Sequence, residues 1–323
     1  MSTLNNPSNR SFVPDWHGKP YYSLDSYLKN KYGEKVYKIA LDAGFTCPNR
    51  DGTISSGGCI FCSKGGSGEH AIATKGKNVT EQLEEGLKLF RSKKIGNKFI
   101  AYFQAYTNTY APISVLRTLY EEALGHEQIV GISIATRPDC LPEDVLYLLA
   151  DIKAKYPDKF IWIELGLQTI HERTAHFIRR GYPLSVFEKA MDRLKALDIP
   201  VIVHVILGLP GESLTDILET INYLNHAGIW GIKLQLLHVL KDTALAKYYE
   251  AEEFETYTLD EYLHVLTECI AHLNPEIVIH RVTGDGPKDL LIAPQFSKNK
   301  RLVLNSLHRK LKETGITQGI KLR

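Results

Sequence analysis

Three cysteines that lie close together in the chain are the residues best suited to chemistry. Cys47, Cys59 and Cys62 form a C-x11-C-x2-C pattern whose intervening residues are mostly turn formers. Three thiolates can bind three corners of a cubane [4Fe–4S] cluster, which leaves the fourth iron without a protein ligand. A small molecule can chelate that iron. The pattern therefore predicts a catalytic cluster rather than an electron-carrying one, which normally has four cysteines.

A structural zinc ion is the alternative use of the same thiols. His70 could supply a fourth ligand, and C-x2-C is a common zinc half-site. A zinc ribbon normally has a second such pair, and the sequence contains no second C-x2-C. Cys140 and Cys269 lie far apart in the chain, so we interpret both as structural thiols.

Composition and charge predict a globular protein of the cytoplasm. The chain has 44% hydrophobic and 24% charged residues, a polar amino terminus and only five cysteines in 323 residues. It contains no apolar run long enough to span a bilayer, so no membrane partner is expected. The net charge of +2 attracts no nucleic acid overall, but residues 298–323 carry eight Lys or Arg and one acid. Those charges fit a solvated helix face as well as an RNA-contacting tail.

Short β-branched and aromatic runs alternate with helical patterns, which indicates βα units and a parallel sheet. The expected strands are Val36–Leu41, Phe99–Phe103, Ile129–Ala135, Phe160–Leu165, Val201–Leu207 and Ile232–Leu237, with Ile277–Val282 as a seventh candidate. Helix starts are expected at the capping boxes Asn78/Glu81 and Thr258/Glu261, at Pro112 and at Pro142, and helices over Leu184–Leu197 and Leu214–Ala227.

Six such units are too few for a closed eight-stranded barrel, so the α/β pattern predicts an open, TIM-like (β/α)6 partial barrel. We expect a core over residues 31–275, an amino-terminal extension over 1–30 and a carboxy-terminal extension with a basic helix over 276–323. The cysteine loop follows the first strand directly. That is the barrel end where active sites form.

The cysteine loop resembles that of radical S-adenosylmethionine (SAM) enzymes, a family with a partial-barrel fold. The stretches K-I-A-L-D-A-G-F-T-C-P-N-R-D-G-T and H-R-V-T-G-D-G-P-K-D-L-L-I-A-P resemble the YhcC/YtqA-type group of that family. The run H-V-I-L-G-L-P-G-E-S is similar to an adenine-contacting pattern of Elongator-like and coproporphyrinogen dehydrogenase-like members, except that His204 replaces its first glycine.

The resemblance implies a SAM pocket. Phe61 would lie beside the adenine, Ile206 would pack on it, and Gly208 would let backbone atoms approach it. Gln104 and Asn108 stand where the family usually has a glycine pair and an acid. A turn with capping residues is the alternative reading of that stretch. Glu164, Gln168 and Arg180 complete the implied pocket, and a charged Glu164 inside a barrel requires a partner.

The resemblance also implies substrate contacts. The segment T-R-P-D, which holds Arg137 and Asp139, resembles the Elongator catalytic subunit, whose family acts on tRNA wobble uridines. A structural ion pair is the alternative role for these two residues. The remaining expected substrate contacts are His204, Arg281, Asp285 and Lys288. The alternative for His204 is a structural role, as an interior histidine whose ring nitrogens are hydrogen-bonded within the protein.

The implied activity is reductive cleavage of SAM followed by hydrogen abstraction from a substrate, with a reducing partner such as flavodoxin or ferredoxin. The implied substrate is a tRNA whose wobble carboxymethylaminomethyl-uridine becomes aminomethyl-uridine. Two other functions stay open from the sequence. One is a radical SAM oxidoreductase acting on a small metabolite or porphyrin-like molecule, and the other is a non-catalytic Fe–S or zinc scaffold.

Overall fold

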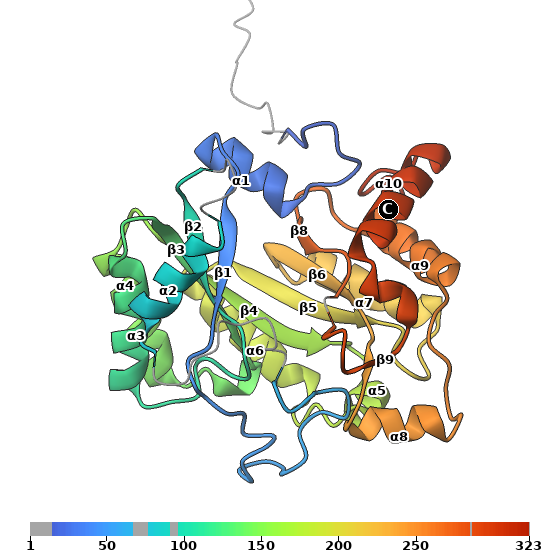
Figure 1. Ribbon diagram of the computed structural model, residues 1–323, viewed down its shortest axis with the longest axis horizontal. Helices are drawn as coiled ribbons and strands as arrows, with labels where there is room; N and C mark the ends of the chain where they lie inside the picture. Colours follow the sequence, from blue (N-terminus) through green and yellow to red (C-terminus); the bar gives the residue numbers. More distant parts are fainter. Residues whose placement is uncertain (1–14, 67–76, 91–95, 285, 323) are drawn as a thin grey trace, which may run out of the picture.

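A curved parallel sheet forms the centre of the molecule, and most helices pack along its outer face (Figure 1). The computed structural model describes residues 15–66, 77–90, 96–284 and 286–322. Asp285 and His70, both singled out in the sequence, lie outside these residues.

The sheet has seven parallel strands in the order β1-β2-β3-β4-β5-β6-β8. Their bounds are β1 Tyr37–Leu41, β2 Phe99–Phe103, β3 Ile129–Thr136, β4 Phe160–Gln168, β5 Val201–Leu207, β6 Gly231–Leu236 and β8 Val278–Arg281. The partial-barrel prediction is confirmed, and the seventh candidate strand joins the sheet as β8. Only β4 differs much from its predicted bounds, because it continues three residues past Leu165 to Gln168.

The described residues form ten α-helices. They are α1 Leu24–Tyr32, α2 Val79–Lys88, α3 Ile113–Gly125, α4 Glu143–Lys155, α5 Glu172–Phe177, α6 Leu184–Ala196, α7 Leu214–His226, α8 Ala244–Glu250, α9 Leu259–His272 and α10 Lys300–Thr314. Six of them, α2, α3, α4, α6, α7 and α9, begin at a predicted start. Both predicted capping boxes form, at Asn78 on α2 and at Thr258 on α9. Within the described ranges, no helix has the length and apolar character needed to cross a membrane.

The strands alternate between two faces, as strand geometry requires. The outer face carries aliphatic residues such as Ile132, Ile163 and Val203, which pack against the helices as the main core. The inner face changes along the strands. Near the strand starts it is apolar, with Trp162, Ile100 and Ile202 packed against Leu28 of α1, whereas further along it becomes polar.

The two ends of the chain close the amino-terminal side of the sheet. α1 covers the apolar inner layer, and the carbonyl of Tyr22 accepts a hydrogen bond from the backbone N–H of Ile279 in β8 (2.8 Å). Gln318 joins this segment to the carboxy terminus: its Oε1 accepts from the N–H of Tyr22 at 2.9 Å. Because β8 falls inside residues 276–323, the sheet itself reaches into the region expected as an extension. The three-part division stays a prediction.

A two-stranded antiparallel sheet of β7 (Val239–Leu240) and β9 (Leu291–Ala293) lies beyond β6. The sequence did not indicate it, because strands of two and three residues are too short to show a periodic pattern.

Candidate active site

All three cysteines of the predicted cluster line one small cavity of about 180 Å³ at the carboxyl ends of the strands. The loop that carries them is held by backbone hydrogen bonds. The N–H of Ile60 donates to the carbonyl of Ile178 at 3.1 Å, and the carbonyl of Ile60 accepts from the N–H of Leu245 at 2.8 Å. Ile60 is itself fully buried. The C-I-F-C turn is therefore fixed to the start of α8 and to the end of α5.

Arg50 supports the other half of the loop. Its guanidinium donates to the carbonyl of Cys62 at 2.7 Å and to that of Ser63. Gly58 has a φ of +73°, and a Cβ there would lie 2.9 Å from the Nε of Arg50. A glycine is therefore required where the loop crosses this arginine.

The set of ligands fits an iron–sulfur cluster. Three cysteine thiols line the cavity. Three cysteines can bind three irons of a cubane and leave the fourth iron open, whereas a structural zinc ion normally has four protein ligands.

The electrostatics of the thiols agree with a bound cationic cluster. Burial, with the neighbouring Cys62 thiolate, raises the pKa of Cys59 to about 12. Three thiolates that share one partly buried site therefore need a positive partner such as iron. Asn49 stands behind this site, with its Nδ2 3.5 Å from the sulfur of Cys59. The residues present thus fit a [4Fe–4S] cluster with one iron open.

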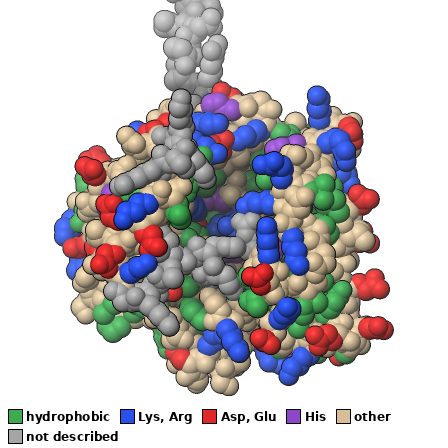
Figure 2. All heavy atoms as spheres, viewed as in Figure 1, with side chains coloured by type: hydrophobic (Ala, Val, Ile, Leu, Met, Phe, Trp, Pro, Cys, Tyr) green, Lys and Arg blue, Asp and Glu red, His purple; other side chains and the backbone are tan. Residues whose placement is uncertain are grey.

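A second, larger cavity of about 1170 Å³ adjoins the first. Its lining includes residues of β1, α2, β8 and the segment before α10, so it extends toward the open side of the barrel between the edge strands. Figure 2 shows this hollow with lysine, arginine and histidine side chains around it. The residues that line both cavities are Phe61, Tyr102, Gln104, Gln168, His204, Lys233, Gln235 and Arg281.

Glu164 is the centre of a buried polar network in the middle layer of the barrel. Its carboxylate accepts hydrogen bonds from Ser133 (2.6 Å), Lys38 (2.7 Å) and Lys233, and Nε2 of His204 lies at 2.8 Å. Burial alone would raise the pKa of Glu164, but Lys233 and Lys38 hold it well below its usual range. Glu164 is thus ionised and fully paired, as a charge inside a barrel requires.

His204 is neutral in this network. Burial and the charge of Lys233 lower its pKa to about 4. Because the carboxylate of Glu164 can only accept, Nε2 carries the proton, and Nδ1 faces the side-chain amide of Gln235 at 3.4 Å. His204 is therefore a satisfied interior histidine that also forms part of the wall between the two cavities.

The structure brings several of the expected SAM-pocket residues together. Phe61, Gln104 and Gln168 line both cavities, and Ile206 lines the larger one. Asn108 and Gly208 line neither. The amide of Asn108 donates to the carbonyls of Ala105 and Ala135 (3.1 and 2.9 Å), which joins β2 to β3. Their roles toward SAM stay predictions.

The arginines near the small cavity are committed to protein partners. Arg137 forms a bidentate ion pair with Asp139 (2.9 and 2.7 Å) and donates to the carbonyl of Arg180 at 3.0 Å. Arg180 donates to the carbonyls of Tyr182, Leu167 and Thr169. Both guanidinium groups lie over the ring of Tyr182. These contacts give Arg137, Asp139 and Arg180 a structural role, and their contacts with substrate or SAM stay predictions.

Several residues of the site were not singled out from the sequence, among them Lys38, Tyr102, Lys233 and Gln235. A signal for the lysines was available, because each interrupts an otherwise apolar strand, Y-K-I-A-L or G-I-K-L-Q-L. A charge in the middle of a buried strand points to a paired interior network.

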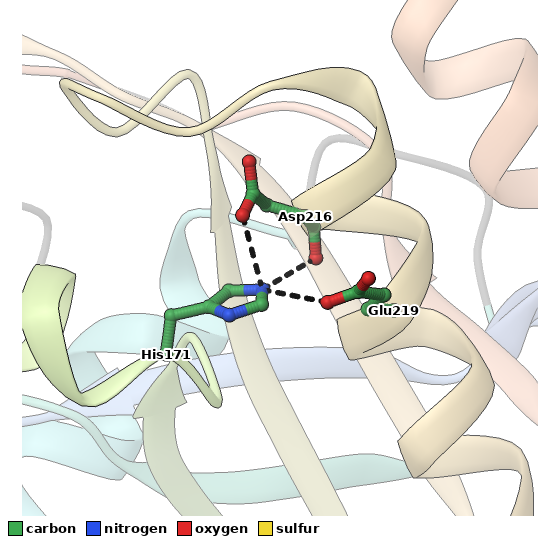
Figure 3. A group of neighbouring side chains, drawn as sticks. All are labelled: His171, Asp216 and Glu219. Carbon is green, nitrogen blue, oxygen red and sulfur yellow. Dashed lines mark hydrogen bonds and ion pairs between the residues drawn. The ribbon is translucent and has the colours of Figure 1, made fainter.

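His171, Asp216 and Glu219 form a second cluster with metal-ligand residue types, on the outside of the sheet beside α7 (Figure 3). Its contacts are structural. Nε2 of His171 bonds the carbonyl of Asp216 at 2.8 Å, and the Asp216 carboxylate caps α7 through Ser213 and pairs with Arg173. The carboxylate has little capacity left for a metal.

Comparisons with known proteins agree with this site. Residues 49–224 match the family model described as the Radical SAM superfamily, and residues 229–313 match that of the Radical SAM C-terminal domain. In fold, the chain resembles the archaeal Elp3 of Methanocaldococcus infernus, with a TM-score of 0.66 at 15% identity. This match covers 88% of the present chain and 64% of that one, and it concerns the fold alone.

Sequence similarity to two bacterial proteins extends over nearly the whole chain. The identity to YtqA of Bacillus subtilis is 42%, over 93% of this chain and 92% of YtqA. The identity to YhcC of Escherichia coli is 38%, over 91% and 93% of the two chains. With three thiols at the mouth of a parallel partial barrel, these matches establish that the chain belongs to the radical SAM superfamily, in the group of YtqA and YhcC.

Proposed function

We propose that the protein is a radical SAM enzyme that acts on the C5 side chain of a tRNA wobble uridine. The proposed reaction converts carboxymethylaminomethyl-uridine to aminomethyl-uridine and begins with hydrogen abstraction from the glycine-derived carbon. Loss of one further electron, for which the oxidised cluster would be the acceptor, would give an imine. Water would then cleave the C–N bond of that imine, which releases glyoxylate and leaves the amine on the uridine. The observation that carries the proposal is the direct contact between a three-thiol cavity and a large cavity lined with basic residues. A carboxylated side chain on a polyanion fits such a cavity.

Each part of the site has a role in this proposal. Cys47, Cys59 and Cys62 hold the cluster, which supplies reductive cleavage of SAM when it is bound. Phe61, Gln104, Gln168 and Ile206 form the wall against which the nucleoside and methionine parts of SAM would lie. The buried network around Glu164 fixes the floor of the site, so that the reacting groups meet in one orientation.

The rim of the larger cavity supports an RNA substrate. Lys288 and Lys298 line it and are exposed, and α10 continues from there with the exposed Arg301, Arg309 and Lys312. Phosphate contacts of this kind position RNA without reading its sequence. The expected reducing partner, such as flavodoxin or ferredoxin, and the tRNA would both be met in the cytoplasm.

Nucleoside analysis of tRNA tests the function. Purified tRNA containing carboxymethylaminomethyl-uridine is incubated anaerobically with reconstituted protein, SAM and dithionite, and the nucleosides and 5′-deoxyadenosine are measured. We expect aminomethyl-uridine and 5′-deoxyadenosine together. Cys62→Ala should abolish both, whereas Cys269→Ala, which removes a thiol buried in α9, should retain both. Unchanged wobble nucleosides in every tRNA from a deletion strain would refute the proposal.

A radical SAM oxidoreductase acting on a small carboxylated metabolite is the second candidate. The same cavity favours it, because apolar residues such as Leu237 and Phe90 line the cavity beside the basic ones. A yield of 5′-deoxyadenosine that depends on a metabolite extract and not on tRNA would favour this reading. Metal analysis addresses the remaining alternative, since zinc without iron or sulfide would indicate a scaffold.

A further inference from the structure

Arg281 differs from the other arginines that line the two cavities. It is the last residue of β8 and lines both cavities. Arg50, Arg137 and Arg180 all donate to backbone carbonyls or to Asp139. Among the described residues, the guanidinium of Arg281 has no hydrogen bond or ion pair. A planar group with five donors therefore faces the cavity unused.

Among the residues that the structure describes, no anion is available to pair with Arg281. The carboxylate of Glu164 already accepts from Ser133, Lys38 and Lys233, and Nε2 of His204 is also hydrogen-bonded to it. Within the described part of the chain, no aspartate or glutamate lines the larger cavity. Lys38 and Arg281 together carry more charge than Glu164 balances, whatever the protonation state of Lys233. The described side chains therefore leave an unbalanced positive charge in the interior.

The position of Arg281 relates this charge to the chemistry. It belongs to the wall shared by the thiol cavity and the larger cavity. An anion bound there would lie at the boundary between the cluster and SAM on one side and the substrate on the other. A carboxylate matches the guanidinium fork with two parallel hydrogen bonds, which fixes direction as well as position.

We propose that Arg281 binds the carboxylate of the substrate side chain. The inference rests on the proposed function, in which this carboxylate is the glycine-derived one. The carbon that loses its hydrogen is bonded directly to that carboxylate. Anchoring the carboxylate therefore presents this carbon at the boundary with the thiol cavity. SAM also carries a carboxylate, so an experiment must separate the two ligands.

Equilibrium binding to the anaerobic holoprotein makes the separation. The probes are the nucleoside 5-carboxymethylaminomethyl-uridine, its methyl ester and SAM. The variants are Arg281→Gln, Arg281→Lys and the matched control Arg117→Gln, whose arginine lies on α3, pairs with Asp151 and lines neither cavity. Iron content and circular dichroism establish that each variant is folded and loaded.

The expected result is specific to one probe and one position. Arg281→Gln should weaken binding of the acid by roughly 10- to 100-fold, the value of a charged hydrogen bond, and leave the ester and SAM unchanged. Arg281→Lys should give an intermediate loss, because it keeps the charge without the fork. Arg117→Gln should leave the binding of all three probes unchanged.

Three results would overturn the inference: equal weakening of acid and ester, no loss for the acid, or a loss confined to SAM. The last result would assign the carboxylate of SAM to Arg281. Failure of the proposed function is a separate outcome, since it is read from conversion of tRNA by the wild-type protein. If tRNA is not converted but the acid preference disappears in Arg281→Gln, the subsite remains and the substrate is another carboxylate.

Discussion

At the residue scale, Glu164 determines the electrostatics of the barrel interior. It is fully buried and its carboxylate is hydrogen-bonded to groups from four strands: Lys38 of β1, Ser133 of β3, His204 of β5 and Lys233 of β6. A buried charge of this kind is tolerated only because its hydrogen-bonding capacity is filled. The same contacts hold four strands of the sheet at fixed distances. An open barrel needs such contacts, because its first and last strands do not pair with each other.

Glu164→Gln should therefore destabilise the protein strongly. The amide cannot balance the charge of the two lysines, and removing one partner of a buried ion pair costs about 3–5 kcal/mol. Chemical denaturation of anaerobic protein measures the free energy of unfolding. Glu127→Gln is the control, because Glu127 is exposed and has no ion pair among the described residues. Equal stability of the two variants would show that the network around Glu164 makes no net contribution to the free energy of unfolding.

His204 should make the stability depend on pH in a defined window. Its folded pKa of about 4 lies below the ordinary 6.5, so the unfolded chain binds more protons between these values. The contribution of His204 is present above pH 6.5 and is lost as the pH falls toward 4. In His204→Gln the free energy of unfolding should therefore fall less steeply with decreasing pH, by up to about 1.4 kcal/mol per pH unit.

The control for this pH dependence is His264→Gln, at an exposed position of α9. The wild-type slope should persist in it. His280, which is partly buried and has a lowered pKa, stays in both variants and retains part of the slope. An unchanged slope in His204→Gln would mean that the histidine is not held neutral in the folded state.

At the element scale, Gly208 ends β5 with a φ of +88°, and a Cβ there would lie 3.0 Å from the ring of Tyr257. Gly211, three residues later, has a φ of +81° and nothing within 4 Å. Gly208→Ala and Gly211→Ala should each lower the free energy of unfolding by about 1 kcal/mol, because both place a side chain at a positive φ. Gly208→Ala should lower it by about another 1 kcal/mol, because its Cβ also presses on the ring of Tyr257. Thermal unfolding measures both, and Tyr257→Ala should remove the difference. Equal losses would argue against the ring contact.

Gln318 should act as a latch between the two ends of the chain. Its Nε2 donates to the carbonyls of Asn274 (2.7 Å) and Ile277 (2.8 Å), while Oε1 accepts from Tyr22. Gln318→Ala leaves buried backbone groups without partners and should cost about 2 kcal/mol. Thr317→Ala, at the exposed neighbouring position, should cost little. The denaturation midpoints of the two variants measure the difference. Similar midpoints would contradict a stabilising role of Gln318 between the two ends of the chain.

The sequence predicted the elements better than the contacts between them. All seven strands of the sheet were predicted because β-branched runs such as V-I-V-H-V-I-L mark buried parallel strands locally. The end of β4 was missed because Gly166 and Gln168 look like a turn, although both lie within the strand. The pairing of Glu164 with Lys38 and Lys233 was out of reach, because it depends on how the curved sheet brings β1, β4 and β6 together.

At the scale of the whole molecule, the net charge of +2 hides an uneven distribution. Basic groups line the larger cavity and its rim, and no acid lines that cavity among the described residues. Acids and bases on the outer helices pair with one another instead, as Lys155 does with Glu121 and Lys153 with Asp198. A polyanion would therefore be attracted to one side of the molecule, even though the protein is nearly neutral.

This asymmetry predicts how the proposed binding of tRNA should depend on salt. Each phosphate contact adds about 0.9 to the slope of log affinity against log salt for a duplex. The double variant Lys288→Gln/Lys298→Gln removes two exposed cations at the rim and should lower that slope by about 1–2. Lys153→Gln/Lys155→Gln removes the same charge from α4 and should leave the slope unchanged. Filter binding or fluorescence anisotropy between 50 and 300 mM salt, roughly the range in which such slopes are read, measures both. Equal slopes in the two double variants would mean that net charge, and not the rim of the cavity, attracts the RNA.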